Sequence, residues 1–340
     1  NQQMINPTFY DLLPQGEEIQ NLQTQIRNNR MSHALLITGE NGTGKKTLAR
    51  LIAATLLCSD DGNQPCGTCS NCIRVYDNEH PDMICIEKGI PLCADAKKSK
   101  NSIPIDDIRE MIRLSSAYPF EGGNRVVLIF NAEDMTIQAQ NSLLKILEEP
   151  PINTYFVLTS DHPEQLLVTI KSRCRFLKMK PWEEQAIIRI LSEKGINKEK
   201  AQLAAYSCNG SIGYAIELAD DENYWKLRNE IITSFFGTQE RSNIMSVSSH
   251  WKENKSDADL LFNILEENIQ IMLEYRITKR KDNKLQHFSS KWRSFAATAD
   301  IERFIYLLNR VSESRKQCGF NVSIQAIVEQ LLLSFMGEVQ

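Results

Sequence analysis

A glycine-rich segment has the spacing of a phosphate-binding loop. Gly39, Gly42 and Gly44 precede Lys45 and follow the apolar run 34–38. Glycine lets backbone N–H groups converge on phosphate oxygens, and a lysine here reaches the outer phosphates of a nucleotide. The segment predicts a nucleotide-binding fold. Two interpretations of the loop stay open, namely weak, metal-independent ATP binding or an inherited turn without a ligand.

The position after the loop lysine cannot provide its usual metal ligand. A phosphate loop normally continues with Ser or Thr, whose hydroxyl binds Mg²⁺, but here Lys46 follows Lys45. Thr47 lies one residue later, about 100° further round a helix, so we do not expect it to take over. The site has therefore lost one ligand for the metal.

The acidic residues of an ATPase are also missing from the end of the third expected strand. A carboxylate there holds the metal, and a second one activates water. This chain has Asn131 and Ala132 at that point, and Glu133 and Asp134 follow, displaced from where the carboxylates should point. An amide and a methyl group cannot do acid–base chemistry. We expect no ATP hydrolysis by this chain.

Four cysteines form a C-x₇-C-x₂-C-x₂-C array, namely Cys58, Cys66, Cys69 and Cys72. The two-residue gaps let neighbouring thiolates converge on one tetrahedral ion, which predicts a structural Zn²⁺ site with no open position. An iron–sulfur cluster is the alternative with the same ligands. Reduced cysteines in a surface loop, with Cys58 packed at a helix end, are the alternative without a metal.

Strand and helix patterns alternate through the first half of the chain, which is typical of an α/β fold with a parallel sheet covered on both faces. Helical spacing occupies 47–57, 105–114 and 136–147. The five expected strands are Ala34–Thr38, Asp82–Ile86, Val126–Phe130, Thr154–Thr159 and Phe176–Met179. We therefore predict an α/β nucleotide-binding domain at 1–179, with the zinc module at 58–72.

Strand signals stop at Pro181. Helical patterns at 183–194, 198–207 and 211–219 predict a small helical lid at 180–220. Further amphipathic helices, including 258–275 and 301–312, predict an all-helical domain at 221–340.

Composition narrows the function classes. The chain has 340 residues and a formal net charge of only −4, which argues against an autonomous DNA-binding protein. No apolar run is long enough to cross a membrane and no leader is visible, so the expected location is the cytoplasm, away from membranes.

These motifs, in this order, resemble the clamp-loader branch of the AAA+ ATPases in bacterial DNA polymerase III. The resemblance covers about residues 9–219. It rests on the glycine loop, the cysteine array and five further segments, namely Ser32–Leu36, His80–Asp82, Ile105–Glu110, Asn141–Pro151 and Ser172–Cys174. It implies an AAA+ domain, a lid and a helical collar that joins the subunits in a ring.

The resemblance also implies roles for single residues. Arg173, in Ser172–Cys174, would reach across a subunit interface to the γ-phosphate in a neighbouring motor subunit, as a catalytic arginine in trans. Its alternative is a surface arginine paired with a carboxylate. The polar sensor of the fourth strand corresponds to Ser160 or Asp161, and Gly213 replaces the lid arginine that touches the γ-phosphate in relatives.

We therefore predict a non-hydrolysing clamp-loader subunit. By resemblance its partners are the motor (gamma/tau) and delta subunits, and it would act on the sliding clamp and primed DNA through the complex. The rival interpretation, an active motor ATPase, is disfavoured by Lys46, Asn131, Ala132 and Gly213. A zinc-dependent DNA-binding module on an inactive ATPase scaffold is a third interpretation, but the array lacks a basic stripe and a recognition helix.

Overall fold

The structure is a computed structural model that describes residues 8–60, 64–92, 101–237, 244–251, 257–279, 285, 288–319 and 322–338. The chain divides into two compact units, Asn1–Glu217 and Leu218–Gln340, which are described one at a time. The finer division that the sequence indicates, with boundaries at 179 and 220, stays a prediction.

The N-terminal unit is built on a five-stranded sheet in the order β2-β3-β4-β1-β5, and every neighbouring pair is parallel. The strands are β1 (Ala34–Thr38), β2 (Met83–Ile86), β3 (Arg125–Ile129), β4 (Thr154–Ser160) and β5 (Arg175–Lys178). The expected α/β class with a parallel sheet is confirmed, and each strand lies within a residue or two of its expected range.

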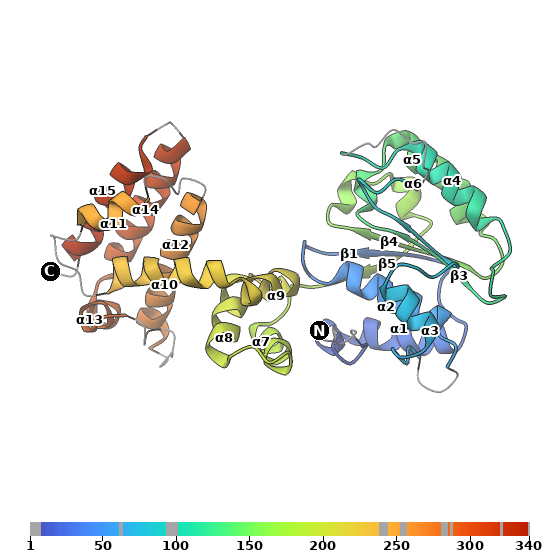
Figure 1. Cartoon of the computed structure of the whole chain (residues 1–340), viewed down its shortest axis with the longest axis horizontal. Helices are drawn as coiled ribbons and strands as arrows, with labels where there is room; N and C mark the ends of the chain where they lie inside the picture. Colours follow the sequence, from blue (N-terminus) through green and yellow to red (C-terminus); the bar gives the residue numbers. More distant parts are fainter. Residues whose placement is uncertain are drawn as a thin grey trace. The chain divides into compact units, whose positions relative to one another are not determined.

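Helices cover both faces of this sheet, as its apolar strands require. One core joins alternate strand residues such as Leu36, Val127 and Phe156 to the helices α4 (Ile105–Ser115), α5 (Ile137–Glu148) and α6 (Val168–Lys171). The helix α2 (Lys45–Leu57) contacts β1, β3 and β4 from the other face, and α1 (Glu17–Arg27) and α3 (Ser70–Tyr76) pack beside it (Figure 1).

Strand register places the candidate residues at one edge of the sheet. Thr38, at the end of β1, pairs with Ser160, at the end of β4, and β3 ends beside β4. The glycine loop, Asn131 and Asp161 follow these three strands directly. In a parallel sheet with crossover helices, ligand sites form at this carboxyl edge.

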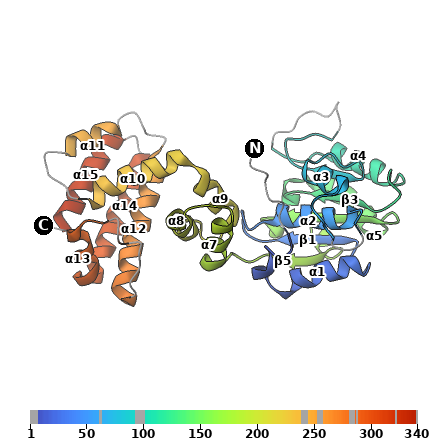
Figure 2. The same ribbon diagram turned by 60° about the horizontal axis from the view of Figure 1, so that its bottom comes forward.

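Three short helices follow the sheet (Figure 2), namely α7 (Glu184–Glu193), α8 (Lys198–Ser207) and α9 (Ile212–Asp220). The helices α7 and α8 pack against each other. The turn before α9 contains Asn209 and Gly210, both with positive φ, which ends α8 and redirects the chain. The helical patterns predicted for this segment are confirmed.

The C-terminal unit is helical. Its helices are α10 (Glu222–Phe236), α11 (Ile244–His250), α12 (Ala258–Thr278), α13 (Ser290–Thr298), α14 (Ile301–Gly319) and α15 (Ile324–Glu338). Buried Arg228 of α10 donates from Nη1 and Nη2 to the two carboxylate oxygens of Glu267 on α12, at 3.0 and 2.8 Å. Aromatic rings fill the core, with Phe236 and Trp292 in edge contact at 5.2 Å.

None of the helices in the described residues is both long and apolar enough to cross a membrane. The expected location of the protein stays a prediction.

Candidate functional site

The loop lysine is buried, and the chain itself satisfies its ammonium group. The Lys45 side chain is 6% exposed. Its Nζ donates to the carbonyl oxygens of Gly39 and Glu40, at 2.8 and 2.5 Å, and forms an ion pair with Asp161 Oδ1 at 2.7 Å. An ammonium group has three N–H donors, and these contacts use all of them. A phosphate could reach Lys45 Nζ only by displacing one of these partners.

Asp161 is itself held in place. Its backbone N–H donates to Glu133 Oε1 at 2.8 Å, and Asn131 Nδ2 lies 3.4 Å from its second carboxylate oxygen. Glu133 and Asp134 lie in the 3₁₀ helix η2 (Ala132–Asp134), and Asp134 pairs with Lys88 at 3.0 Å. Both acidic residues after β3 are therefore engaged in contacts within the fold.

Lys46 occupies the position of the absent hydroxyl ligand, and its charge points toward the ends of β2 and β3. Its Nζ forms an ion pair with Glu87 and lies 5.4 Å from the ring centre of Phe130. The Lys46 side chain is 41% exposed, and Glu87 balances its charge. The position therefore offers an ammonium group in place of the hydroxyl ligand that Mg²⁺ would use.

The start of α9 and the residues before α7 pack directly on the glycine loop. The Gly213 N–H donates to the Gly42 carbonyl at 2.9 Å, and Trp182 Nε1 donates to the Thr43 carbonyl at 2.8 Å. A Cβ atom on Gly42 would lie 1.8 Å from Ser211 Oγ, and one on Gly213 would lie 3.3 Å from Gly42 Cα. Gly42, with a φ of +76°, favours glycine on backbone grounds, and a side chain at 213 would need a shift of a few tenths of an ångström in the loop.

Arg173 lies between α6 and β5, away from these loop contacts. Its Nε donates to Glu148 Oε1 at 2.8 Å, Nη2 donates to the same oxygen, and Nη1 donates to the Thr169 carbonyl at 2.8 Å. The Arg173 side chain is 28% exposed. In the isolated chain Arg173 is thus paired with a carboxylate, as expected for an ordinary surface arginine. Its side chain is also partly exposed to solvent.

The four predicted cysteines come together. One ligand atom from each of Cys58, Cys66, Cys69 and Cys72 lies within 4.8 Å of the others, so this cluster could hold a metal ion. The sulfurs accept backbone N–H bonds, as from Cys69 N to Cys66 Sγ at 3.3 Å and from Cys72 N to Cys69 Sγ at 3.4 Å. Desolvation by burial opposes ionisation of Cys69, but hydrogen bonds from Ser59 and Cys72 outweigh it and lower the pKa of its thiol to about 6. Four soft thiolate donors fit Zn²⁺ or another thiophilic ion.

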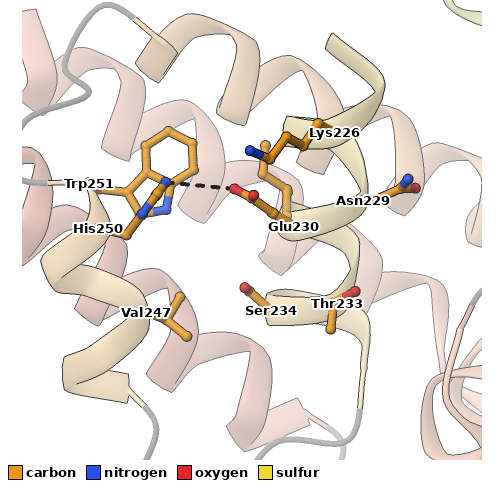
Figure 3. Close-up of a pocket in the computed structure, with 9 residues that line it drawn as sticks. Lys226, Asn229, Glu230, Thr233, Ser234, Val247, His250 and Trp251 are labelled. Carbon is orange, nitrogen blue, oxygen red and sulfur yellow. Dashed lines mark ion pairs between the residues drawn. The ribbon is translucent and has the colours of Figure 1, made fainter. Parts of the chain in front are cut away.

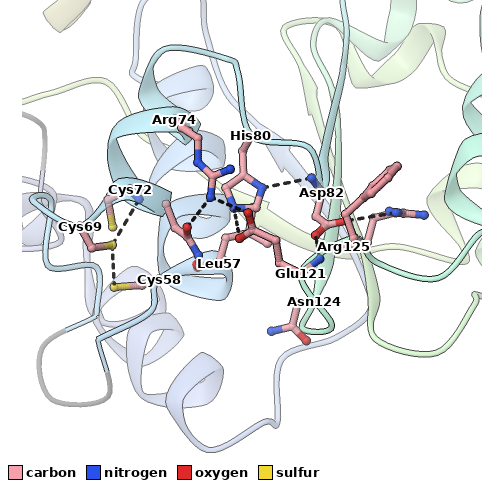
Figure 4. A network of polar contacts seen from close by, with 12 residues as sticks. Leu57, Cys58, Cys69, Cys72, Arg74, His80, Asp82, Glu121, Asn124 and Arg125 are labelled. Atoms are coloured by element: carbon pink, nitrogen blue, oxygen red, sulfur yellow. Dashed lines mark hydrogen bonds and ion pairs between the residues drawn. The ribbon is translucent and has the colours of Figure 1, made fainter.

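A polar network ties the cysteine cluster to the sheet (Figure 4). Arg74 of α3 donates to Glu121 Oε1 at 2.7 Å, and Glu121 lies 3.7 Å from His80 Nε2. Beyond it, the buried Asp82 carboxylate accepts from Arg125 Nη2 at 3.0 Å. Desolvation by burial works against the ionised form of Asp82, yet backbone N–H bonds and Arg125 hold its pKa below the usual value. The helix that carries Cys72 is thus linked through partly exposed Arg74 and Glu121 to buried His80, and Asp82 and Arg125 form a buried pair beside it.

The C-terminal unit has an open groove of about 510 Å³ beside α10 and α11 (Figure 3). Trp251 forms part of its wall, and Glu230 and His250 face each other there at 3.6 Å. The groove contains none of the residues that the sequence singles out.

Sequence reasoning identified the loop, its missing ligands and the cysteine cluster, but it missed two charge partners. Asp161 was considered only as a sensor, and Glu148 only as part of a recognisable segment. The position of Asp161 directly after β4 could have predicted its pairing with Lys45, because the carboxyl ends of β1 and β4 meet at one edge of the sheet. No comparable pattern in the sequence indicates that Glu148 pairs with Arg173.

Comparisons with known proteins agree with the clamp-loader resemblance. The model of the family described as "DNA polymerase III, delta subunit" matches residues 14–183. The Bacillus subtilis protein "DNA polymerase III subunit delta'" is 28% identical over 317 residues, covering 92% of this chain and 93% of its own. The Escherichia coli protein of that name is 33% identical over 63% of this chain and 62% of its own length. "DNA polymerase III subunit tau/gamma" of Haemophilus influenzae is also 33% identical, over 63% of this chain and 30% of its own.

The contact between Gly42 and Ser211 predicts the effect of one methyl group. We expect Gly42→Ala to lower the free energy of unfolding by about 2–4 kcal/mol, because the Cβ atom meets Ser211 Oγ and the backbone has a φ of +76°. Urea denaturation measures this change. Gly122→Ala is the matched control, since Gly122 has a φ of +74° and an open surrounding, and it should cost about 1 kcal/mol. Equal losses for the two variants would contradict the close packing at the loop.

Proposed function

Since this chain belongs to the family described as "DNA polymerase III, delta subunit", we propose that it is a clamp-loader subunit of the delta' type that does not hydrolyse ATP and supplies Arg173 to a neighbouring subunit. Its partners are the motor (gamma/tau) and delta subunits. Through that complex it helps to place the sliding clamp on primed DNA.

The observation that carries the non-hydrolysing role is the closed state of the glycine loop. Lys45 already has three partners, and Lys46 brings a positive charge to the metal position. Asn131 and Ala132 provide no carboxylate, and Gly213 is packed against the loop where the lid arginine of a motor subunit would stand. The delta' relative of Escherichia coli and the tau/gamma relative of Haemophilus influenzae are both 33% identical to the chain, so identity alone does not separate the two roles, and these positions are what favours the delta' role.

The position and chemistry of Arg173 support its role in trans. A planar guanidinium spans two oxygens of a phosphoryl group and stabilises the charge that develops on them during transfer. Arg173 is partly exposed in a short connection between α6 and β5, and its contacts lie within the N-terminal unit. An arginine held in this way can reach the nucleotide of a neighbour without rearrangement of the sheet.

The chemistry of the cysteine cluster supports a structural Zn²⁺ ion. Four sulfur donors leave no open coordination position for substrate, and the cluster closes the loop between α2 and α3. Zinc bound by the four thiolates would fix this loop to the end of α2. The role we propose for it is stability of the N-terminal unit, not catalysis.

Replacement of Arg173 tests the catalytic role. In a complex reconstituted with the motor and delta subunits, we expect Arg173→Ala to lower ATP turnover at the neighbouring site about a thousandfold, because fingers of this kind contribute about 10³–10⁵ in rate. Steady-state phosphate release with clamp and primed DNA measures the effect, and gel filtration checks assembly. The control is Arg113→Ala, which also removes a surface arginine paired with a glutamate. Unchanged turnover in an assembled Arg173→Ala complex would refute the role in trans.

Metal analysis tests the zinc site. Protein prepared without chelator should contain about one zinc ion per chain by plasma mass spectrometry, and Cys69→Ser should lose that zinc. We expect its melting temperature to fall by about 5 °C or more, because metal binding stabilises the folded loop. Cys318→Ser, in α14, is the control and should change neither quantity. Zinc-free protein with the melting temperature of the metal-loaded form would disprove the site.

A further inference from the structure

The carboxylate of Glu148 holds one side of the Arg173 guanidinium. Arg173 Nε and Nη2 both donate to Glu148 Oε1. The Thr169 carbonyl of α6 accepts from Nη1 at 2.8 Å, and Ser172 Oγ lies at 3.5 Å from the same nitrogen. Two separate elements therefore fix the orientation of the guanidinium plane, namely the end of α5 and the backbone of α6.

These contacts leave donors on the opposite edge of the guanidinium. An arginine has five N–H groups in one plane. One Nη2 hydrogen has no part in the contacts with Glu148 and Thr169. The contact of Nη1 with Ser172 Oγ, at 3.5 Å, is weak, so a phosphate oxygen can replace the serine there. The edge between Nη1 and Nη2 can thus bind two phosphate oxygens while the Nε side stays on Glu148.

The place of Glu148 in the fold fits this use. It is the last residue of α5, where the helix dipole disfavours a negative charge, so the carboxylate gains from a nearby cation. The preceding turns of α5 are anchored by the buried side chains Leu143, Ile146 and Leu147. Glu148 is half exposed, so the pair adds little to stability. A contact of this kind is suited to orienting Arg173 rather than to holding the domain together.

We propose that Glu148 is a positioning residue for Arg173, which orients the guanidinium toward the γ-phosphate of the neighbouring subunit. The proposal rests on the role in trans proposed above for Arg173. In this role Glu148 acts through its contacts with the arginine and not on the nucleotide itself. With the orientation set before assembly, the arginine loses less conformational freedom when it meets the phosphate.

The test uses the complex reconstituted with motor and delta subunits, and it follows the Arg173-dependent turnover, defined as the difference between the parent complex and the Arg173→Ala complex. We expect Glu148→Ala to lower this turnover about tenfold through kcat, with the KM for ATP unchanged, because a misplaced group loses transition-state contacts. Glu148→Gln keeps an oxygen acceptor for Nε and should retain about half. Glu149→Ala, at the adjacent exposed position, is the matched control and should have no effect.

The double variant Glu148→Ala with Arg173→Ala separates positioning from a general structural effect. It should turn over ATP at the rate of Arg173→Ala alone, because Glu148 has nothing left to orient. A further loss in the double variant, or a Glu148→Ala complex as active as the parent, would overturn the proposal. Faster turnover by Glu148→Ala would also overturn it, because the carboxylate would then restrain the arginine. If Arg173→Ala itself leaves turnover unchanged, the role in trans fails, which is a different result from failure of Glu148 alone.

Discussion

The burial of the Lys45 ammonium group constrains the whole edge of the sheet on which the candidate site lies. A buried charge needs a partner and filled hydrogen bonds, since the cost of removing it from water is several kcal/mol. The carbonyls of Gly39 and Glu40 and the carboxylate of Asp161 meet that need. This set of contacts joins the loop after β1 to the end of β4. In a working ATPase the phosphates of the nucleotide would balance this charge, whereas here the protein does so itself.

The lid contact belongs to the same arrangement. Gly213 and Ser211 pack closely on the loop, so that a Cβ atom at Gly42 would meet Ser211 Oγ and one at Gly213 would lie 3.3 Å from Gly42 Cα. Gly213 therefore contacts the loop through its backbone, where the proposed role has no sensing arginine. Lys46, paired with Glu87, stands where a hydroxyl ligand for the metal is expected. Together these features support the proposed role, in which the chain does not hydrolyse ATP and serves the nucleotide of a neighbouring subunit.

Much of this could be predicted from the sequence, because it depends on local pattern. Apolar runs bounded by turns located the five strands, and the spacing of the cysteines predicted their convergence. Ion pairs between residues far apart in the sequence were harder to predict, because several carboxylates were possible partners for each cation. Asp161 is 116 positions from Lys45 and Glu148 is 25 from Arg173, so their pairing depends on strand register and helix packing. The helix α3 also escaped prediction, because a helix of seven residues within a cysteine loop has no clear period.

Phosphate release by the isolated chain tests the central claim most directly. The account predicts that the purified chain, supplied with ATP and Mg²⁺, releases phosphate no faster than its Lys45→Ala variant, with both at the rate of buffer alone. The site lacks the ligands and the water-activating carboxylate, so loss of the lysine has nothing to remove. Robust turnover that Lys45→Ala abolishes would contradict the account and identify the chain as a motor ATPase.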